Sequence, residues 1–123
     1  MTINDLAAFG ANTQDGLQRC LNNEAFYLRM VKKASEDANF QKLYDAMAVG
    51  DLDAAFAAAH ALKGVMGNLA LTPIFAPASQ LTEVLRARLQ QDCMALVSAI
   101  RSAQAALAAI CGTMDGRAAD TRG

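Results

Sequence analysis

The amino-acid sequence predicts an all-α protein, an antiparallel four-helix bundle with an additional short N-terminal helix. Alanine, leucine, glutamine and methionine, which all favour helix, are abundant, and Pro73 and Pro77 are the only two prolines. Apolar residues recur at spacings of three and four along several segments that short connections join. No segment shows a strand signal, so the amphipathic segments are expected to pack as antiparallel helices.

The length of the chain and its cysteines predict one domain without disulfides. With 123 residues, of which 54% are hydrophobic and 19% charged, the chain is long enough for one compact domain with a real core. We expect this domain over residues 1–112 and a flexible polar tail over residues 113–123. Cys20, Cys93 and Cys111 are odd in number and widely spaced in apolar patterns, so we interpret them as buried free thiols rather than a disulfide framework or a metal site.

Charge and hydropathy exclude several classes of partner. The formal net charge is −1 and the basic residues are scattered, which is unlike a nucleic-acid-binding surface or a polybasic membrane patch. The longest apolar stretches are interrupted by His60 and Lys63 and are shorter than the roughly 18 to 20 residues of a membrane span. Met1 to Ala11 carry Asp5 and no basic residue, unlike a secretory signal. We expect a cytoplasmic protein whose partners are proteins.

The first half of the chain predicts short helices followed by longer ones. Residues 3–9 and 15–22 form a broken N-terminal helical segment, and Asn23 caps the next helix. The apolar side of that helix is predicted to carry Phe26, Met30 and Ala34. Residues 37–49 predict a further helix before Gly50, a plausible stop, with Phe40, Leu43 and Met47 at spacings of three and four. One bent helix over residues 24–49 is the alternative.

The most regular helix follows Asp51, which can cap it. Its apolar stripe consists of Leu52, Ala55, Ala59, Leu62, Met66 and Leu69.

Two further helices complete the bundle. Thr72 reads as an N-cap with Pro73 at the first helical position, and Pro77 should kink or delay this helix. Its apolar face comprises Ile74, Ala78, Leu81, Leu85 and Leu89. After a break near Gln91 and Asp92, a last helix is expected to end at Gly112. Its apolar face comprises Cys93, Leu96, Ile100, Ala103, Leu107 and Ile110.

His60, the only histidine, lies outside the apolar stripe of its helix. At 100° per residue it falls roughly 130° from the centre of the stripe, so its imidazole should face solvent. The residues one or two turns away are Asp53, Phe56, Ala57, Lys63, Gly64 and Gly67.

Gly64 and Gly67 stand inside a helix, where each glycine costs about 1 kcal/mol relative to alanine. Access explains this loss, because glycines one and two turns from His60 let another protein approach the ring. Tight helix packing is the alternative, although Gly64 points roughly 170° away from the stripe. We therefore expect a partner to dock on this surface, which is formed by Phe56, Ala57, Gly64, Gly67 and Asn68.

Lys63 is three residues beyond His60, so the two Cβ atoms should lie about 5 to 6 Å apart. Its ammonium can therefore reach a phosphoryl group on the ring. A lone lysine on a helix surface is usually only a solvated charge, so this role depends on the histidine. Imidazole offers a neutral nucleophilic nitrogen near neutral pH, and phosphoryl transfer relies on positioning and charge neutralisation.

The run from His60 to Leu69, HALKGVMGNL, resembles the signature of histidine-containing phosphotransfer (HPt) domains of bacterial two-component relays. Weaker similarity at Leu17, Arg19 and Tyr27, and downstream through Leu81, extends the resemblance over residues 15–90. The resemblance implies that His60 is phosphorylated, that Lys63 stabilises the phosphoryl group and that Gly64 leaves room for a receiver domain.

The resemblance also implies a phosphoryl carrier without kinase activity of its own. Its partners would be receiver domains, one on a hybrid sensor histidine kinase and others on response regulators. No cofactor or metal is expected on this chain, because the Mg²⁺ used in transfer belongs to the receiver. We also expect a monomer that binds neither nucleic acid nor membrane.

The sequence departs from the family pattern at several positions. Met66 stands where a smaller residue is usual, and Ala70 replaces a common glycine. The family often has a Gln or Glu near the second ring nitrogen of the histidine, and that position falls on Thr82 here. The ring-orienting group is therefore open, with Gln80 and Glu83 as further candidates on the same helix.

Other functions fit the residues less well. An enzyme with His60 as general base would need a second histidine, a GxSxG motif, a phosphate-cradling loop or a carboxylate pair at a pocket, and none of these is identified in the sequence. A kinase would need an ATP-binding domain, and a ferritin-like metal site would need repeated Glu-x-x-His pairs. The alternative that stays open is a phosphorylation-independent helical adaptor that docks a protein on the same surface.

Overall fold

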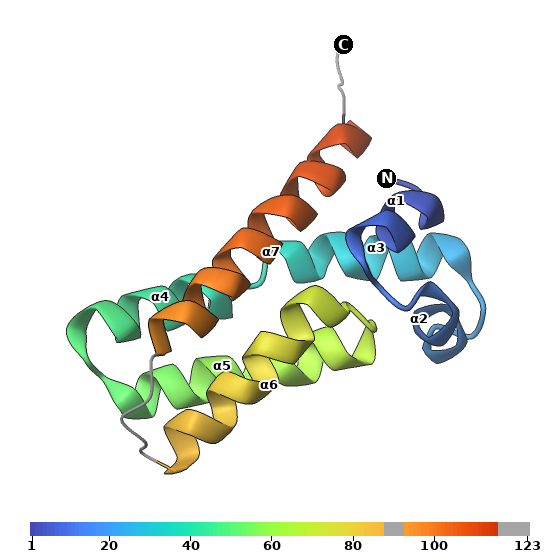
Figure 1. The fold of residues 1–123 in the computed structure, drawn as a ribbon. Helices are drawn as coiled ribbons and strands as arrows, with labels where there is room; N and C mark the ends of the chain where they lie inside the picture. The colour runs from blue at the N-terminus through green and yellow to red at the C-terminus, as the bar shows by residue number, and fades with distance from the viewer. Residues whose placement is uncertain (88–92, 116–123) are drawn as a thin grey trace.

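The computed structural model describes residues 1–87 and 93–115, and every regular element in these ranges is a helix (Figure 1). The seven helices of these residues are α1 (Ile3–Phe9), α2 (Thr13–Arg19), α3 (Glu24–Ser35), α4 (Ala38–Val49), α5 (Leu52–Asn68), α6 (Thr72–Ala87) and α7 (Cys93–Asp115). The all-α prediction is confirmed. The predicted break at Gln91 and Asp92, the predicted apolar position Leu89 and the tail from residue 116 lie outside the described residues.

The longer helices form the predicted bundle. Helices α3 and α4 follow one another along one side, α5 packs between α4 and α6, and α7 packs against α6 and α3 (Figure 1). Helices α4, α5 and α6 run in alternating directions, as short connections require. The largest fully buried side chains are Tyr27, Phe40, Leu6, Leu43, Leu62, Met66, Leu71, Ile74, Leu81, Ile100, Leu107 and Val31.

Helices α3 and α4 are separate rather than one bent helix. Asp37 begins α4, because its carboxylate accepts a hydrogen bond from the Asn39 backbone N–H at 2.8 Å. On the predicted inner face of α3, Ala34 is buried and Met30 is half-buried, but the first position is wrong, since Phe26 is exposed and Tyr27 is buried in its place. Tyr27 faces inward because its hydroxyl donates to the Leu69 carbonyl, 2.8 Å away at the end of α5.

The N-cap of α5 and all but the first residue of its buried stripe agree with the sequence prediction. Gly50 ends α4 in the left-handed region, with φ of 75°, and the Asp51 carboxylate accepts from the Ala54 N–H at 3.0 Å. Leu52 is 39% exposed, so the first member of the predicted stripe stays outside the core. The remaining members are buried, namely Ala55, Ala59, Leu62, Met66 and Leu69.

Proline does not interrupt α6. The helix begins at Thr72, one residue before the predicted start, and continues through Pro77 to Ala87, so the expected delay is wrong. Pro77 lies in the second turn, where its missing N–H leaves only the Pro73 carbonyl without its helical partner.

The last helix is longer than predicted. Helix α7 passes through Gly112, the predicted stop, because a glycine weakens a helix without removing its backbone N–H. Residues 93–112 also have the length and mean hydropathy, 1.6, of a membrane span, so the prediction that no stretch is so long and apolar is wrong. One such helix is weak evidence for a membrane, and its Val97, Ile100 and Leu107 are buried in the core.

The three cysteines are free thiols, as predicted. Cys20 and Cys111 are buried, whereas Cys93 is half-buried at the start of α7.

The N-terminal helices are anchored at the end of α5. The Asn12 N–H donates to the Ala70 carbonyl at 2.9 Å, directly after α5. Gly16 of α2 lies against the Tyr27 ring, where a Cβ atom would overlap the ring. Helix α2 ends at Arg19 rather than at residue 22, because Leu21 and Asn22 both adopt φ of 59° in the left-handed region. These contacts hold α2 near the C-terminal end of α5.

Candidate functional site

His60 is exposed on α5, as the helical projection predicts. Its ring stacks on Phe56, one turn earlier, with the ring centroids 5.8 Å apart and the planes 13° apart. Arg86 of α6 lies on the same phenyl ring, with its Cζ atom 5.4 Å from the centroid. Phe56 therefore supports the imidazole and is itself held by a cation from the next helix.

A surface hollow of about 340 Å³ lies beside His60. Its lining residues come from three helices: Arg19, His60, Lys63, Gly64, Gly67, Asn68 and Phe75. The structure thus brings Lys63, Gly64, Gly67 and Asn68 together with the histidine, as the sequence predicts. Arg19 and Phe75 also line the hollow, although neither was predicted as a site residue.

Gly64 and Gly67 have different surroundings. A Cβ atom at Gly64 would meet no heavy atom within 4 Å, which agrees with the predicted access. A Cβ atom at Gly67 would lie 3.0 Å from Cε1 of Phe75, so this glycine allows close packing of α5 on α6. At Gly67 the contact favours the packing alternative, because the missing side chain makes room for a ring of the same protein, although Gly67 also lines the hollow beside His60.

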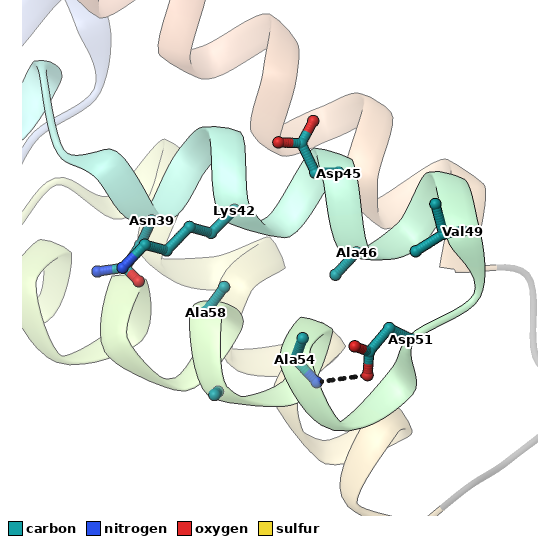
Figure 2. A pocket seen from close by; sticks show the side chains of 9 residues that line it. Asn39, Lys42, Asp45, Ala46, Val49, Asp51, Ala54 and Ala58 are labelled. Atoms are coloured by element: carbon teal, nitrogen blue, oxygen red, sulfur yellow. Dashed lines mark hydrogen bonds between the residues drawn. The ribbon is translucent and has the colours of Figure 1, made fainter.

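Ala57 belongs to a different hollow. It helps line a groove of about 530 Å³ between α4 and α5, and His60 is not among the residues that line this groove. Figure 2 shows Asn39 and Lys42 at one end of this groove, Val49 and Asp51 at the other, and small alanine side chains between them. The predicted docking residues are therefore divided between two surfaces.

The three candidate ring-orienting residues lie on α6 in different environments. Thr82 is fully buried and its hydroxyl donates to the Ala78 carbonyl at 2.7 Å, so its proton is not available to the ring. Gln80 and Glu83 are exposed, and the Glu83 carboxylate lies 3.7 Å from the Arg86 guanidinium. Among the described residues, the imidazole has a ring contact with Phe56, on which it stacks.

Sequence reasoning did not assign roles to Arg19, Phe75 and Arg86. Arg86 is 26 positions from His60 and reaches the site only because α6 returns along α5. Arg19 was noticed only as part of the family resemblance. Phe75 had a possible signal, since a helix-interior glycine at Gly67 also indicates close packing.

A histidine on the surface of a helical bundle, beside a lysine and an open glycine, defines a candidate phosphoryl carrier. Among the described residues, no three His, Cys, Asp or Glu side chains are grouped so as to hold a metal ion.

Comparison with known proteins identifies the family. The family model described as "Hpt domain" matches residues 28–111, well over half of the chain, and the protein therefore belongs to the Hpt domain family. Members are phosphoryl carriers that act in histidine phosphotransfer and interact with receiver domains in phosphorelays. No curated protein and no solved structure matches this chain.

Proposed function

We propose that this chain accepts a phosphoryl group on His60 from the receiver aspartate of a hybrid sensor kinase and passes it to the receiver of a response regulator. The observation that carries the proposal is the site on α5, where an exposed imidazole, Lys63 and the open Gly64 border one hollow. Family membership supports histidine phosphotransfer, and these residues supply a position for it.

The transfer step needs little chemistry from the carrier. The lone pair of a neutral ring nitrogen attacks phosphorus, and the N–P bond forms as the bond between phosphorus and the aspartate oxygen breaks. The electron pair of the broken bond stays with the carboxylate, and the reverse step loads the next receiver. Lys63, half-buried beside the ring, offsets negative charge on the phosphoryl oxygens.

Phe56 orients the imidazole of His60, which is the nucleophile in this step. Stacking at an interplanar angle of 13° limits rotation of the imidazole and leaves its nitrogens at the edge of the stack. A ring that is already oriented loses less conformational freedom on docking, which favours an in-line approach of the phosphorus.

The same proposal includes the partners and the setting. The chain acts without kinase activity, as a cytoplasmic monomer. The Mg²⁺ needed for transfer belongs to the receiver, and the carrier itself holds no cofactor.

Label transfer tests the proposal. The purified chain is incubated with receiver domains that carry ³²P on aspartate, and we expect label on the chain that is labile to acid and stable to alkali. His60→Gln should take no label while it keeps its helical circular dichroism. Absence of label on the wild-type chain with every cognate receiver, together with unchanged receiver binding by His60→Gln, would show a phosphorylation-independent adaptor instead.

A further inference from the structure

We propose that Arg19 is a second cation of the phosphoryl-transfer site and that it binds an oxyanion presented beside His60. The inference rests on the proposed phosphotransfer function and adds a residue to it. Arg19 lies before residues 28–111, which the family model matches, so that match assigns it no role.

Helix α2 has a defined position on the bundle. Its N-terminal connection is tied to the bundle by the hydrogen bond from the Asn12 N–H to the Ala70 carbonyl, 2.9 Å long. Its Gly16 packs on the ring of Tyr27, and that tyrosine donates to the Leu69 carbonyl. Both carbonyls directly follow α5, so α2 is held against the end of the helix that carries His60.

Arg19 borders the site of His60. It lines the hollow that contains His60 and Lys63, and it also lines a neighbouring hollow of about 290 Å³ with Asn12, Asp15 and Thr72. Arg19, Gly67 and Phe75 border both hollows, so Arg19 lies where the two hollows adjoin. Its side chain is 51% exposed and therefore accessible to a docked partner.

Arg19 has hydrogen-bonding capacity beyond its bond to Asp15. The Arg19 Nε–H bonds the Asp15 carboxylate at 3.1 Å, and this bond uses one of the five N–H donors of a guanidinium. The terminal nitrogens keep the forked geometry that fits a phosphoryl or carboxylate group. An exposed Arg–Asp pair four residues apart on a helix adds little stability, so the pair by itself gives Arg19 little structural value.

The charged residues that line the hollow beside His60 are positive. Among the described residues that line the His60 hollow, Arg19 and Lys63 are cationic and none is acidic. A hollow with this charge attracts an oxyanion, which can be the phosphoryl group on His60 or a carboxylate of the docked receiver. Both groups are oxyanions that a guanidinium can bind. The phosphoryl group would contact Arg19 while His60 is phosphorylated, and the carboxylate would contact it while the receiver is docked.

Four variants test the inference in the label-transfer assay. Arg19→Ala should slow transfer about tenfold, the scale of one charge-assisted hydrogen bond, and Arg19→Lys should restore part of the rate. Asp15→Asn removes the competing charge and should change the rate in the opposite direction, by about two- to threefold. Arg29→Ala, which removes an exposed arginine from the surface of α3, is the matched control and should leave the rate unchanged.

Two readouts separate the sources of the oxyanion. A shorter lifetime of phosphorylated His60 in Arg19→Ala after removal of the receiver indicates contact with the phosphoryl group. An unchanged lifetime with a higher KM for the receiver indicates contact with the partner's carboxylate. Circular dichroism and thermal unfolding of each variant show whether the fold is kept. If Arg19→Ala does not fold, the inference is tested by Asp15→Asn, which should transfer the phosphoryl group faster than the wild type.

Equal rates, lifetimes and KM values in the wild type, Arg19→Ala and Arg29→Ala would overturn the role of Arg19 and leave the carrier function intact. A purely structural Arg19–Asp15 pair would instead make Arg19→Ala and Asp15→Asn change stability and transfer in the same direction, which also overturns it. If the wild-type chain takes no label, the proposed function fails and this inference fails with it.

Discussion

Gly64 and Gly67 are one turn apart on α5, yet the structure gives them opposite surroundings. A Cβ atom at Gly64 would project into open space, whereas one at Gly67 would press on the ring of Phe75. The open turn lies next to His60, and the packed turn leads to Leu69 and Ala70, where Tyr27 and α2 are attached. The comparison shows that one residue type on one helix can serve a partner's approach or the protein's own packing.

Tyr27, which is buried at the end of α5, should make the stability of the protein depend on pH in alkaline solution. Burial raises the pKa of Tyr27 from 10.0 to about 12, and the negative charges of Cys20 and Asp15 add to the rise. The unfolded chain loses this proton from pH 10, so the contribution of Tyr27 to the free energy of unfolding should be unaffected below pH 10. It should then fall by about 2–3 kcal/mol as the pH rises from 10 to 12.

The matched variant for this effect is Tyr27→Phe. At neutral pH it should lose about 1 kcal/mol, because the Leu69 carbonyl loses its donor. Urea unfolding at several pH values measures both curves, and the difference between wild type and variant should shrink or reverse above pH 10. Parallel curves up to pH 12 would contradict the assignment of this titration to Tyr27.

At Gly67, an added methyl group should destabilise the fold. Gly67→Ala gains about 1 kcal/mol of helix propensity, but a Cβ 3.0 Å from Cε1 of Phe75 forces the ring to shift. Overpacking of this kind costs about 1–3 kcal/mol, so we expect a net loss of about 1 kcal/mol in chemical denaturation. Combining it with Phe75→Ala should cost less than the sum of the two single changes, and strict additivity would argue against the contact.

At Gly64, the same substitution should stabilise the fold and impair the function. Gly64→Ala meets no neighbouring atom, so the helix gains about 1 kcal/mol in the free energy of unfolding. The new methyl group occupies the approach to His60 and should slow phosphoryl transfer about tenfold. Thermal unfolding and label transfer check the two effects, and a stabilised variant with the wild-type transfer rate would remove the access role of Gly64.

The smallest expected change in stability concerns Leu21 and Ala70, two residues with a left-handed backbone, one of which is exposed and the other buried. Leu21 has φ of 59° and is 88% exposed, so Leu21→Gly should stabilise the protein by about 1 kcal/mol. Ala70 has φ of 56° but is 7% exposed, and Ala70→Gly gives up a buried methyl group worth about 0.8 kcal/mol. We expect a smaller gain at residue 70, measured by urea unfolding, and a larger gain there would show that burial is not the deciding factor.

Local rules predicted much of the fold. Asp51 and Gly50 were predicted as helix signals from residue type alone, and both lie where the structure begins and ends helices. The stripe of α5 from Ala55 onward follows from periodicity, which also placed His60 on the exposed face. These features depend on neighbours within one or two turns, so the linear sequence contains the information that they need.

Other predictions failed where distant parts of the chain compete. Phe26 and Tyr27 are both aromatic and adjacent, and the buried one, Tyr27, bonds the carbonyl of Leu69, 42 positions further along the chain, and packs on Gly16. Gly112 resembles a stop, and α7 continues through it. Propensity is a weak preference that packing can override.

The sequence by itself determined the fold class, the exposed histidine and the lysine at the next turn, because each follows from helical periodicity and residue chemistry. Tertiary structure decided which glycine is open, placed Phe56 and Arg86 in one stack, and brought Arg19 to the hollow of His60. The physical reason is that these arrangements join helices far apart in the chain, and their geometry exists only after α2, α5 and α6 have packed together.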